Sequence, residues 1–318
     1  MKMIIPEEIT YSDFSINLTD STEGEFDYSG STNYNKDDTV KVSFEKDGTT
    51  RILPEKTFTV ISTDPTNEYP IGSTKWLDNG AVNRHKMFDK YINTQAEAFG
   101  TEVTDPGKIV FTIKTDRQNA IALFGVEGTS VKYELKDYKD TIVETYENTN
   151  LDEGYIQDFE EYIYKPFPFT HDLVQYFSSY LVSKLTVTIE RNETGLYPKC
   201  GYVIVGQSVF IGYTNYGVET GYLSFSKVNR DSFGNVYAQK GNYAKLMTLP
   251  LTIDNVIYDK VQAAAIAVDG IPTVFDGNNE EFNTGYESLL ILGLLIDFRP
   301  IIQYFDISEV SMKIEGII

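Results

Sequence analysis

The chain has 318 residues, is 41% hydrophobic and carries a formal net charge of −20, from 47 acidic and 27 basic residues. This length predicts two or three domains with packed cores. The negative charge would repel a phosphate backbone, which argues against nucleic-acid binding. No apolar run is long enough for a membrane-spanning helix, so we expect no membrane insertion. The lone cysteine, Cys200, forbids an intrachain disulfide, and the N-terminus lacks an apolar leader, so folding in a cytoplasm is expected.

The N-terminal region differs in composition from the rest of the chain. Residues 1–25 are rich in Asp, Ser, Thr and Glu, which favours an arm that becomes ordered only against a neighbouring subunit. Residues 26–84 are predicted to form a small three-stranded module with too little core to be firm alone. The aromatic side chains of this module should therefore matter most, and the candidates are Tyr34, Phe58 and Trp76.

Trp76, the only tryptophan, begins the segment 76–89, in which aromatic and polar side chains are densely mixed. Such a ring either stacks on a bound sugar or packs in a core. Small, polar and apolar residues follow Trp76 in a fixed order: Gly80, Asn83, Arg84, Met87 and Phe88. We favour a buried position at the seam between the N-terminal module and the next domain, with sugar stacking as the alternative.

Residues 85–213 are predicted to form an antiparallel β-sandwich. Short runs with apolar and β-branched residues recur, for example at 109–113, 130–135 and 185–189, and Gly, Asp and Asn turn signals separate them. No helical periodicity intervenes, which favours an antiparallel sandwich over a parallel sheet.

A dense aromatic and proline stretch lies within this domain at 162–169. Such side chains are common in β-sheet packing and in protein interfaces, and they also stack on sugar rings. We predict that this stretch forms a contact between subunits, through Tyr162, Tyr164, Phe167 and Phe169.

Residues 214–318 are predicted to form a β-sheet domain with one helix. Apolar residues recur at helical spacing over about 254–268, Asp254 is a good N-cap, and Gly270 and Pro272 end the pattern. Strand-like runs flank this helix on both sides. The predicted fold class is therefore mainly β and multi-domain, with a sandwich followed by a sheet-plus-one-helix domain.

No pattern of catalytic or metal-binding residues stands out. The two histidines, His85 and His171, belong to no zinc-binding motif, and the acidic turn 276–281 lacks the spacing of a calcium-binding loop. The chain has no nucleophile elbow and no phosphate-binding or dinucleotide-binding glycine loop. Adjacent carboxylates such as Glu160 and Glu161 would face opposite ways in a strand. They therefore give little support to glycosidase chemistry, which needs two carboxyl groups at a set distance across a cleft. We therefore expect no cofactor, no metal and no enzymatic activity, with a glycan-cleaving enzyme as the weakest alternative.

Residues 76–89, Trp-Leu-Asp-Asn-Gly-Ala-Val-Asn-Arg-His-Lys-Met-Phe-Asp, resemble the Trp-x-Asp-x-Gly-x-x-Asn-Arg-x-x-Met-Phe-Asp segment of a family of virion proteins of tailed bacteriophages. These proteins are tail-associated and often described as carbohydrate-binding. Further similarities extend over roughly 30–318, at 200–201, 212–217, 231–236 and 314–316. The resemblance implies a galactose-binding-like jelly roll in the middle and, in the last third, a sheet-plus-helix domain similar to those of tail-tip and tail-ring proteins.

Residues 34–40, together with Phe58 and Trp76, resemble a short chitin-binding carbohydrate module. The pattern is an aromatic residue, a Gly-Asp pair before a valine, a later aromatic residue and then a tryptophan. Here Asp37 stands where glycine is usual, and Phe58 stands where tyrosine is common.

These resemblances imply a structural component of a bacteriophage tail, assembled in the host bacterial cytoplasm. It would act as a non-enzymatic adaptor in a ring, sheath, collar or fibre base, with copies of itself and other virion tail proteins as partners. The alternative is a glycan-binding module that attaches the virion to a host-surface glycan.

Overall fold

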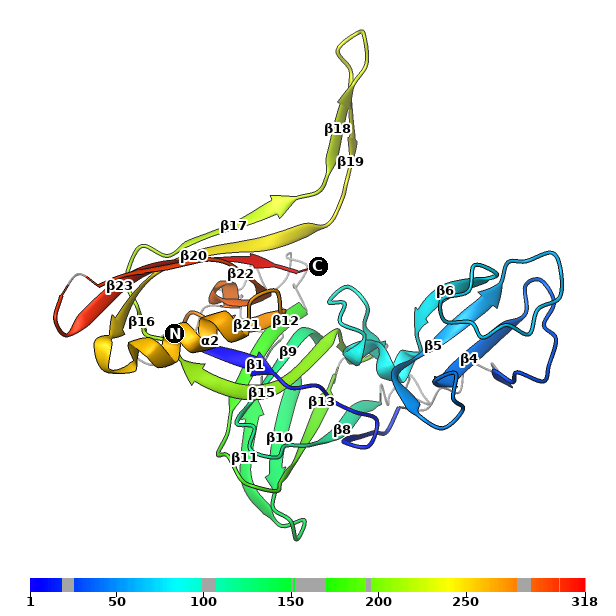
Figure 1. Ribbon diagram of the computed structural model, residues 1–318, viewed down its shortest axis with the longest axis horizontal. Helices are drawn as coiled ribbons and strands as arrows, with labels where there is room; N and C mark the ends of the chain where they lie inside the picture. Colours follow the sequence, from blue (N-terminus) through cyan, green and yellow to red (C-terminus); the bar gives the residue numbers. More distant parts are fainter. Residues whose placement is uncertain are drawn as a thin grey trace.

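The computed structural model describes residues 1–18, 26–98, 107–149, 151, 170–192, 196–278, 287–302 and 304–317. In these ranges the chain is mainly β, with antiparallel sheets and a single α-helix, which confirms the predicted fold class. Figure 1 shows a small N-terminal module beside a larger body, from which a two-stranded hairpin projects.

The N-terminal module contains a four-stranded sheet, ordered β3-β4-β5-β6. Its strands are β3 (Phe26–Asp27), β4 (Thr39–Phe44), β5 (Arg51–Val60) and β6 (Trp76–Ala81). The three longer strands pair antiparallel, and the short β3 adds a parallel edge to β4. The module has its own buried core, made of Tyr34, Val40, Val42, Phe58, Val60 and Trp76.

The sandwich is formed by a five-stranded sheet that packs on one end of a twelve-stranded sheet. The smaller sheet runs β11-β10-β13-β8-β2, with β2 (Phe14–Ile16), β8 (Lys108–Lys114), β10 (Ser130–Lys136), β11 (Ile142–Asn148) and β13 (Lys184–Glu190). The larger sheet contributes β7 (Ala96–Glu97), β9 (Ala120–Glu127), β12 (Thr170–Tyr176), β14 (Lys199–Cys200) and β15 (Tyr202–Phe210). Strand β10 alternates between half-buried and buried side chains, because one face of it lines the shared core.

The other end of the twelve-stranded sheet forms the C-terminal part of the body. Its strands are β16 (Tyr213–Thr214), β17 (Glu219–Ser224), β20 (Tyr243–Asp254), β21 (Thr273–Asp276), β22 (Leu290–Ile301) and β23 (Ile307–Gly316). A short 3-10 turn, η3 (Glu287–Leu289), leads into β22. Helix α2 (Tyr258–Ala267) packs Val261 and Ala264 into this core. The helix expected over 254–268 begins later, because Asp254 accepts a hydrogen bond from the N–H of Val256 and so caps a 3-10 turn, η2 (Asn255–Ile257).

The N-terminal strand β1 (Lys2–Pro6) lies between β15 and β21 and joins the two ends of the twelve-stranded sheet. Residues 1–18 contribute β1 and β2 to the two sheets of the body, so they do not form the free N-terminal extension that their polar composition suggested. Residues 19–25 lie outside the described ranges. Met3 and Ile4 are buried on opposite faces of the strand, which favours this central position. A Cβ atom at Gly206 would lie 2.0 Å from the carbonyl oxygen of Ile5, so glycine permits the close approach. The boundary expected between residues 213 and 214 thus falls inside one continuous sheet.

Candidate functional site

The three module aromatics proposed for sugar stacking or a domain seam are buried in the module itself. Tyr34, Phe58 and Trp76 are each at most 8% exposed. The Trp76 indole Nε1–H donates to the carbonyl oxygen of Glu68 at 3.0 Å, and the Tyr34 ring lies edge-on to it with centroids 5.5 Å apart. Rings buried to this extent offer little surface to a sugar, and their contacts hold the module core together.

The seam between the module and the sandwich is formed further along the same segment, by the 3-10 helix η1 (Asn83–Phe88). Met87 and Phe88 belong to the sandwich core, and the Phe88 ring lies 4.8 Å from that of Phe14. His85 is buried, and its Nδ1 accepts a hydrogen bond from the backbone N–H of Glu55 in β5 at 3.0 Å. The segment therefore joins the two bodies through η1, whereas Trp76 stays inside the module.

Ionisable side chains of β5 and η1 contact one another at the seam. The Glu55 carboxylate is buried and accepts a hydrogen bond from the Arg84 guanidinium. Burial and the neighbouring Arg84 lower the pKa of His85 to about 3, so its imidazole is neutral near neutral pH. A neutral His85 is consistent with Nδ1 acting as an acceptor.

An open groove of about 800 Å³ lies on the module, next to β4. Its walls include the aromatic rings of Tyr28, Phe44 and Tyr69, and its rim includes acidic and amide groups. The Tyr28 and Tyr69 rings lie edge-on with centroids 5.7 Å apart. Their hydroxyls each donate to a backbone carbonyl at 2.6 Å, that of Asn67 and that of Phe44, which fixes both rings. Fixed aromatic walls with a polar rim suit a small polar ligand.

The subunit contact expected at Tyr162, Tyr164, Phe167 and Phe169 lies outside the described residues. Among the described residues, another segment exposes many apolar and aromatic side chains. It is a projecting hairpin, residues 222–243, which we call the arm; it contains β18 (Lys227–Arg230) and β19 (Val236–Gln239) and the adjoining ends of β17 and β20.

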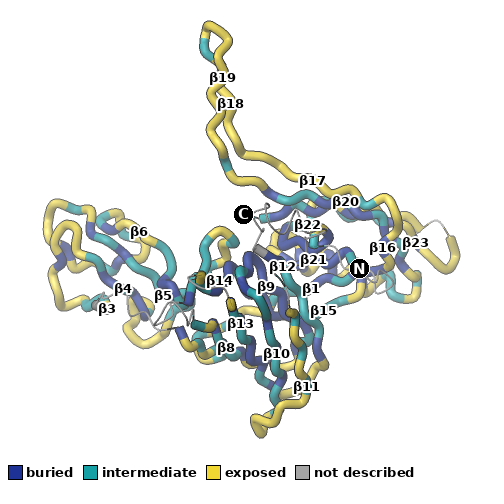
Figure 2. The backbone as a smooth tube through the Cα atoms, turned by 180° about the vertical axis from the view of Figure 1, so that it is seen from behind, coloured by how far each residue is buried: buried dark blue, intermediate teal, exposed yellow. Residues whose placement is uncertain are grey.

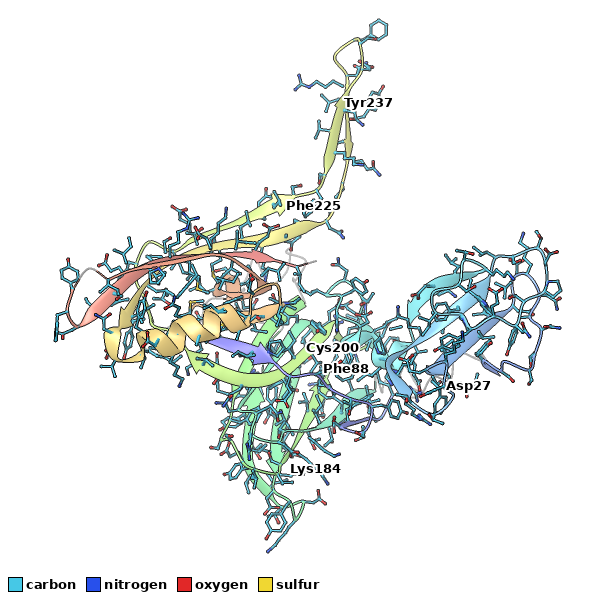
Figure 3. All side chains as sticks on the ribbon, viewed as in Figure 1. Asp27, Phe88, Lys184, Cys200, Phe225 and Tyr237 are labelled. Carbon is cyan, nitrogen blue, oxygen red and sulfur yellow. The ribbon has the colours of Figure 1, made fainter. Side chains whose placement is uncertain are left out.

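The arm buries almost none of its side chains. Between Glu219 and Tyr243 every residue is exposed except Asp231 and Gly241, which are half-buried, and Figure 2 shows the arm exposed along its length. Several of the exposed side chains are large and apolar or aromatic: Tyr222, Phe225, Val228, Phe233, Val236, Tyr237 and Tyr243. In Figure 3 the labelled Tyr237 lies well above the body, with only the arm around it.

Local interactions give the arm a defined shape. At its tip the Asp231 carboxylate accepts hydrogen bonds from the N–H groups of Phe233 and Asn235 at 2.9 and 2.8 Å, and Gly234 takes a φ of +85°. At its base a Cβ atom on Gly241 would lie 2.5 Å from the carbonyl oxygen of Phe225, so glycine permits the bend there. The shape of the arm is therefore set by a hydrogen-bonded turn at its tip and by a close backbone approach at its base.

One face of the two-stranded ribbon is mainly apolar. Residues paired directly across the strands share a face, and Val228 pairs with Ala238 while Arg230 pairs with Val236. The other face carries Lys227, Asn229, Tyr237 and Gln239. The arm is therefore amphipathic, with basic groups beside its apolar side chains.

No metal-binding cluster of His, Cys, Asp and Glu occurs within the described ranges, and no described helix is long and apolar enough to cross a membrane. His171 Nδ1 lies 2.7 Å from a carboxylate oxygen of Glu287, and this contact raises the pKa of His171. Cys200 is fully buried, and burial raises the pKa of its thiol to about 12. That thiol is therefore unreactive in the folded chain.

Comparisons with known proteins give no match. Neither a protein-family model, nor a curated protein, nor a solved structure matches this chain. Evidence for its function therefore comes from its own residues and geometry.

Proposed function

We propose that the protein is a non-enzymatic structural component of a bacteriophage tail that associates with copies of itself and with other tail proteins. In this role it is an adaptor in a ring, sheath, collar or fibre base. The observation that carries the proposal is the arm, an ordered ribbon that exposes apolar side chains on a body with well-packed cores.

An isolated two-stranded ribbon gains little stability in water, because neither of its faces buries apolar surface. Its outer edges also leave backbone groups free to pair with another chain. Exposed apolar and aromatic side chains gathered on one element in this way are typical of sites that bind another protein. The arm therefore fits a protein that works in an assembly.

Two further observations support a tail component in particular. The segment 76–89 resembles a tail-associated virion family, and in this structure it forms the joint that fixes the module to the body. A body whose packed cores lie along one continuous sheet provides a rigid unit for repetition in a ring.

A variant without the arm tests this proposal. Ser224 and Tyr243 already pair across β17 and β20, so a two-residue Asn-Gly turn can replace residues 225–242 without disturbing the body. We expect the intact chain to form assemblies of fixed size in light scattering and the shortened chain to be a folded monomer. A monomeric intact chain at high concentration, or unchanged assemblies after shortening, would contradict the proposal.

A second candidate function is glycan binding, and the module groove favours it. The ligand would lie against Tyr28, Phe44 and Tyr69, not against Trp76. A sugar-stacking role predicts that Tyr69→Phe keeps binding to host polysaccharide and Tyr69→Ala loses it. Tyr138→Ala, at an exposed turn of the sandwich, is the matched control. Equal binding by all three variants, or no binding by the intact chain, would exclude this function.

A further inference from the structure

A second exposed apolar surface lies at the opposite end of the same sheet from the arm. It consists of the residues beside the turn between β22 and β23 and the start of η2, which we call the end patch: Val256, Ile301, Ile302, Tyr304 and Phe305. Phe305 is 97% exposed and Val256 is 90% exposed. Figure 1 shows this turn and the arm at opposite ends of the sheet.

The end patch is held in a defined conformation. The side-chain amide of Asn255 donates to the carbonyl oxygens of Tyr304 and Phe305 at 3.0 and 2.9 Å, and its backbone N–H donates to that of Asp306. Ser308 donates to the Asn255 amide oxygen. Because the backbone is anchored, the exposed side chains form a preorganised surface, which lowers the cost of binding.

The arm carries an excess of basic residues, whereas acidic residues lie beside the end patch. Lys227, Arg230 and Lys240 outnumber Asp231 in the arm, whereas the whole chain has more acidic than basic residues. All three basic side chains are exposed, and none forms an ion pair with a residue that the structure describes. The exposed acids beside the end patch are Asp254, Asp306 and Glu309.

We propose that the arm of one copy binds the end patch of a second copy, with its apolar face on the apolar side chains and its basic residues beside the acids. This inference rests on the proposed self-association and names the two surfaces that meet. Since the two surfaces differ and lie at opposite ends, the contact is head-to-tail, and repetition gives a ring or a filament.

Disulfide trapping tests the contact directly, because the buried Cys200 leaves engineered cysteines as the reactive thiols. Ser232→Cys, next to Phe233 at the tip of the arm, and Ile307→Cys, an exposed position beside the end patch, are made as separate full-length proteins, so that the rings of Phe233 and Phe305 are kept. Mixing them under mild oxidation should give a disulfide-linked dimer at least tenfold more abundant than a mixture of Ser232→Cys with Tyr138→Cys. Dimer levels equal to this control would overturn the inference.

The remaining outcomes separate this inference from the proposed function. A dimer formed as readily by Ser232→Cys alone would show an arm-to-arm contact and overturn the head-to-tail arrangement. Assemblies of fixed size without the mixed disulfide would overturn the inference and leave self-association standing. An intact chain that is monomeric at every concentration would overturn both.

Discussion

The carboxylate of Asp231 accepts a hydrogen bond from the backbone N–H of Phe233 at 2.9 Å, and this contact holds an aromatic side chain that is 90% exposed at the tip of the arm. Hydrogen bonds from Asn235 hold the pKa of Asp231 below its usual range, so the carboxylate stays ionised and keeps the turn closed. A fixed turn that presents a phenyl ring to solvent favours a binding role for that ring.

Phe233→Ser is expected to weaken self-association at least tenfold, equivalent to about 1.4 kcal/mol. Because the Phe233 side chain is 90% exposed in the single chain, thermal unfolding of the monomer should change little. Sedimentation over a range of concentrations measures the first effect and calorimetry the second. Association at the wild-type level would show that the arm tip takes no part in the contact.

Gly241→Ala should disturb the bend at the base of the arm, because the added Cβ would meet the Phe225 carbonyl oxygen. We expect weaker association and faster proteolysis within 225–242, with the body intact. The matched control is Gly221→Ala in β17, where an added Cβ meets nothing within 4 Å. Equal proteolysis of the two variants would contradict the role assigned to Gly241.

Charge reversal should act on the contact and not on the fold. The double variant Arg230→Glu and Lys240→Glu is expected to weaken association about tenfold at low salt, and added salt should reduce this difference in affinity by screening the charges. Adding Asp306→Lys to that variant should restore part of the affinity. A double variant that associates like the wild type, or a triple variant with no recovery, would argue against the charge pairing.

Trp76→Ala should destabilise the module by about 3–5 kcal/mol, the usual cost of removing a buried large aromatic side chain. Leu77→Ala, at the neighbouring exposed position, should cost far less. Hydrogen exchange of β4 to β6 reports the change in each variant. If both substitutions had the same small effect, the burial of Trp76 would not be what holds the module together.

The seam should weaken in acid through His85. Its folded-state pKa of about 3 lies below the ordinary value of 6.5, so the unfolded state binds more protons between these values and stability falls as the pH falls from 6.5. The loss is expected to reach about 3 kcal/mol near pH 4. His85→Gln removes this titration, so its unfolding free energy, measured by chemical denaturation, should lose less over the same pH interval. Parallel pH profiles for the two proteins would rule out this contribution.

Sequence patterns predicted the strands and the helix whose buried positions follow a regular period along the chain. Strand β10 alternates in sequence, and its apolar side chains Val131, Tyr133 and Leu135 are all buried in the sandwich core. The helix was also predicted, although its first turn is a 3-10 turn capped by Asp254. These features depend on periodicity and capping, which a single sequence displays.

Other features depend on contacts between distant parts of the chain, which periodicity does not reveal. Strand β1 pairs with β15 and β21, far away in sequence, so its short apolar run gave no sign of a central strand. The burial of Trp76 was expected, but the order of residues in its segment does not tell which core receives the ring. Strands β18 and β19 have no buried face, so their sequences do not show the alternation that predicts a strand. The turn sequence Asp-Ser-Phe-Gly-Asn between them was the one feature that indicated a hairpin.

A reconstruction of the assembled protein by electron microscopy, with each copy traced, tests the account most directly. It should show the arm of one copy on the end patch of the next, with Phe233 buried in that contact. Copies that meet through other surfaces while Phe233 faces solvent would contradict the account.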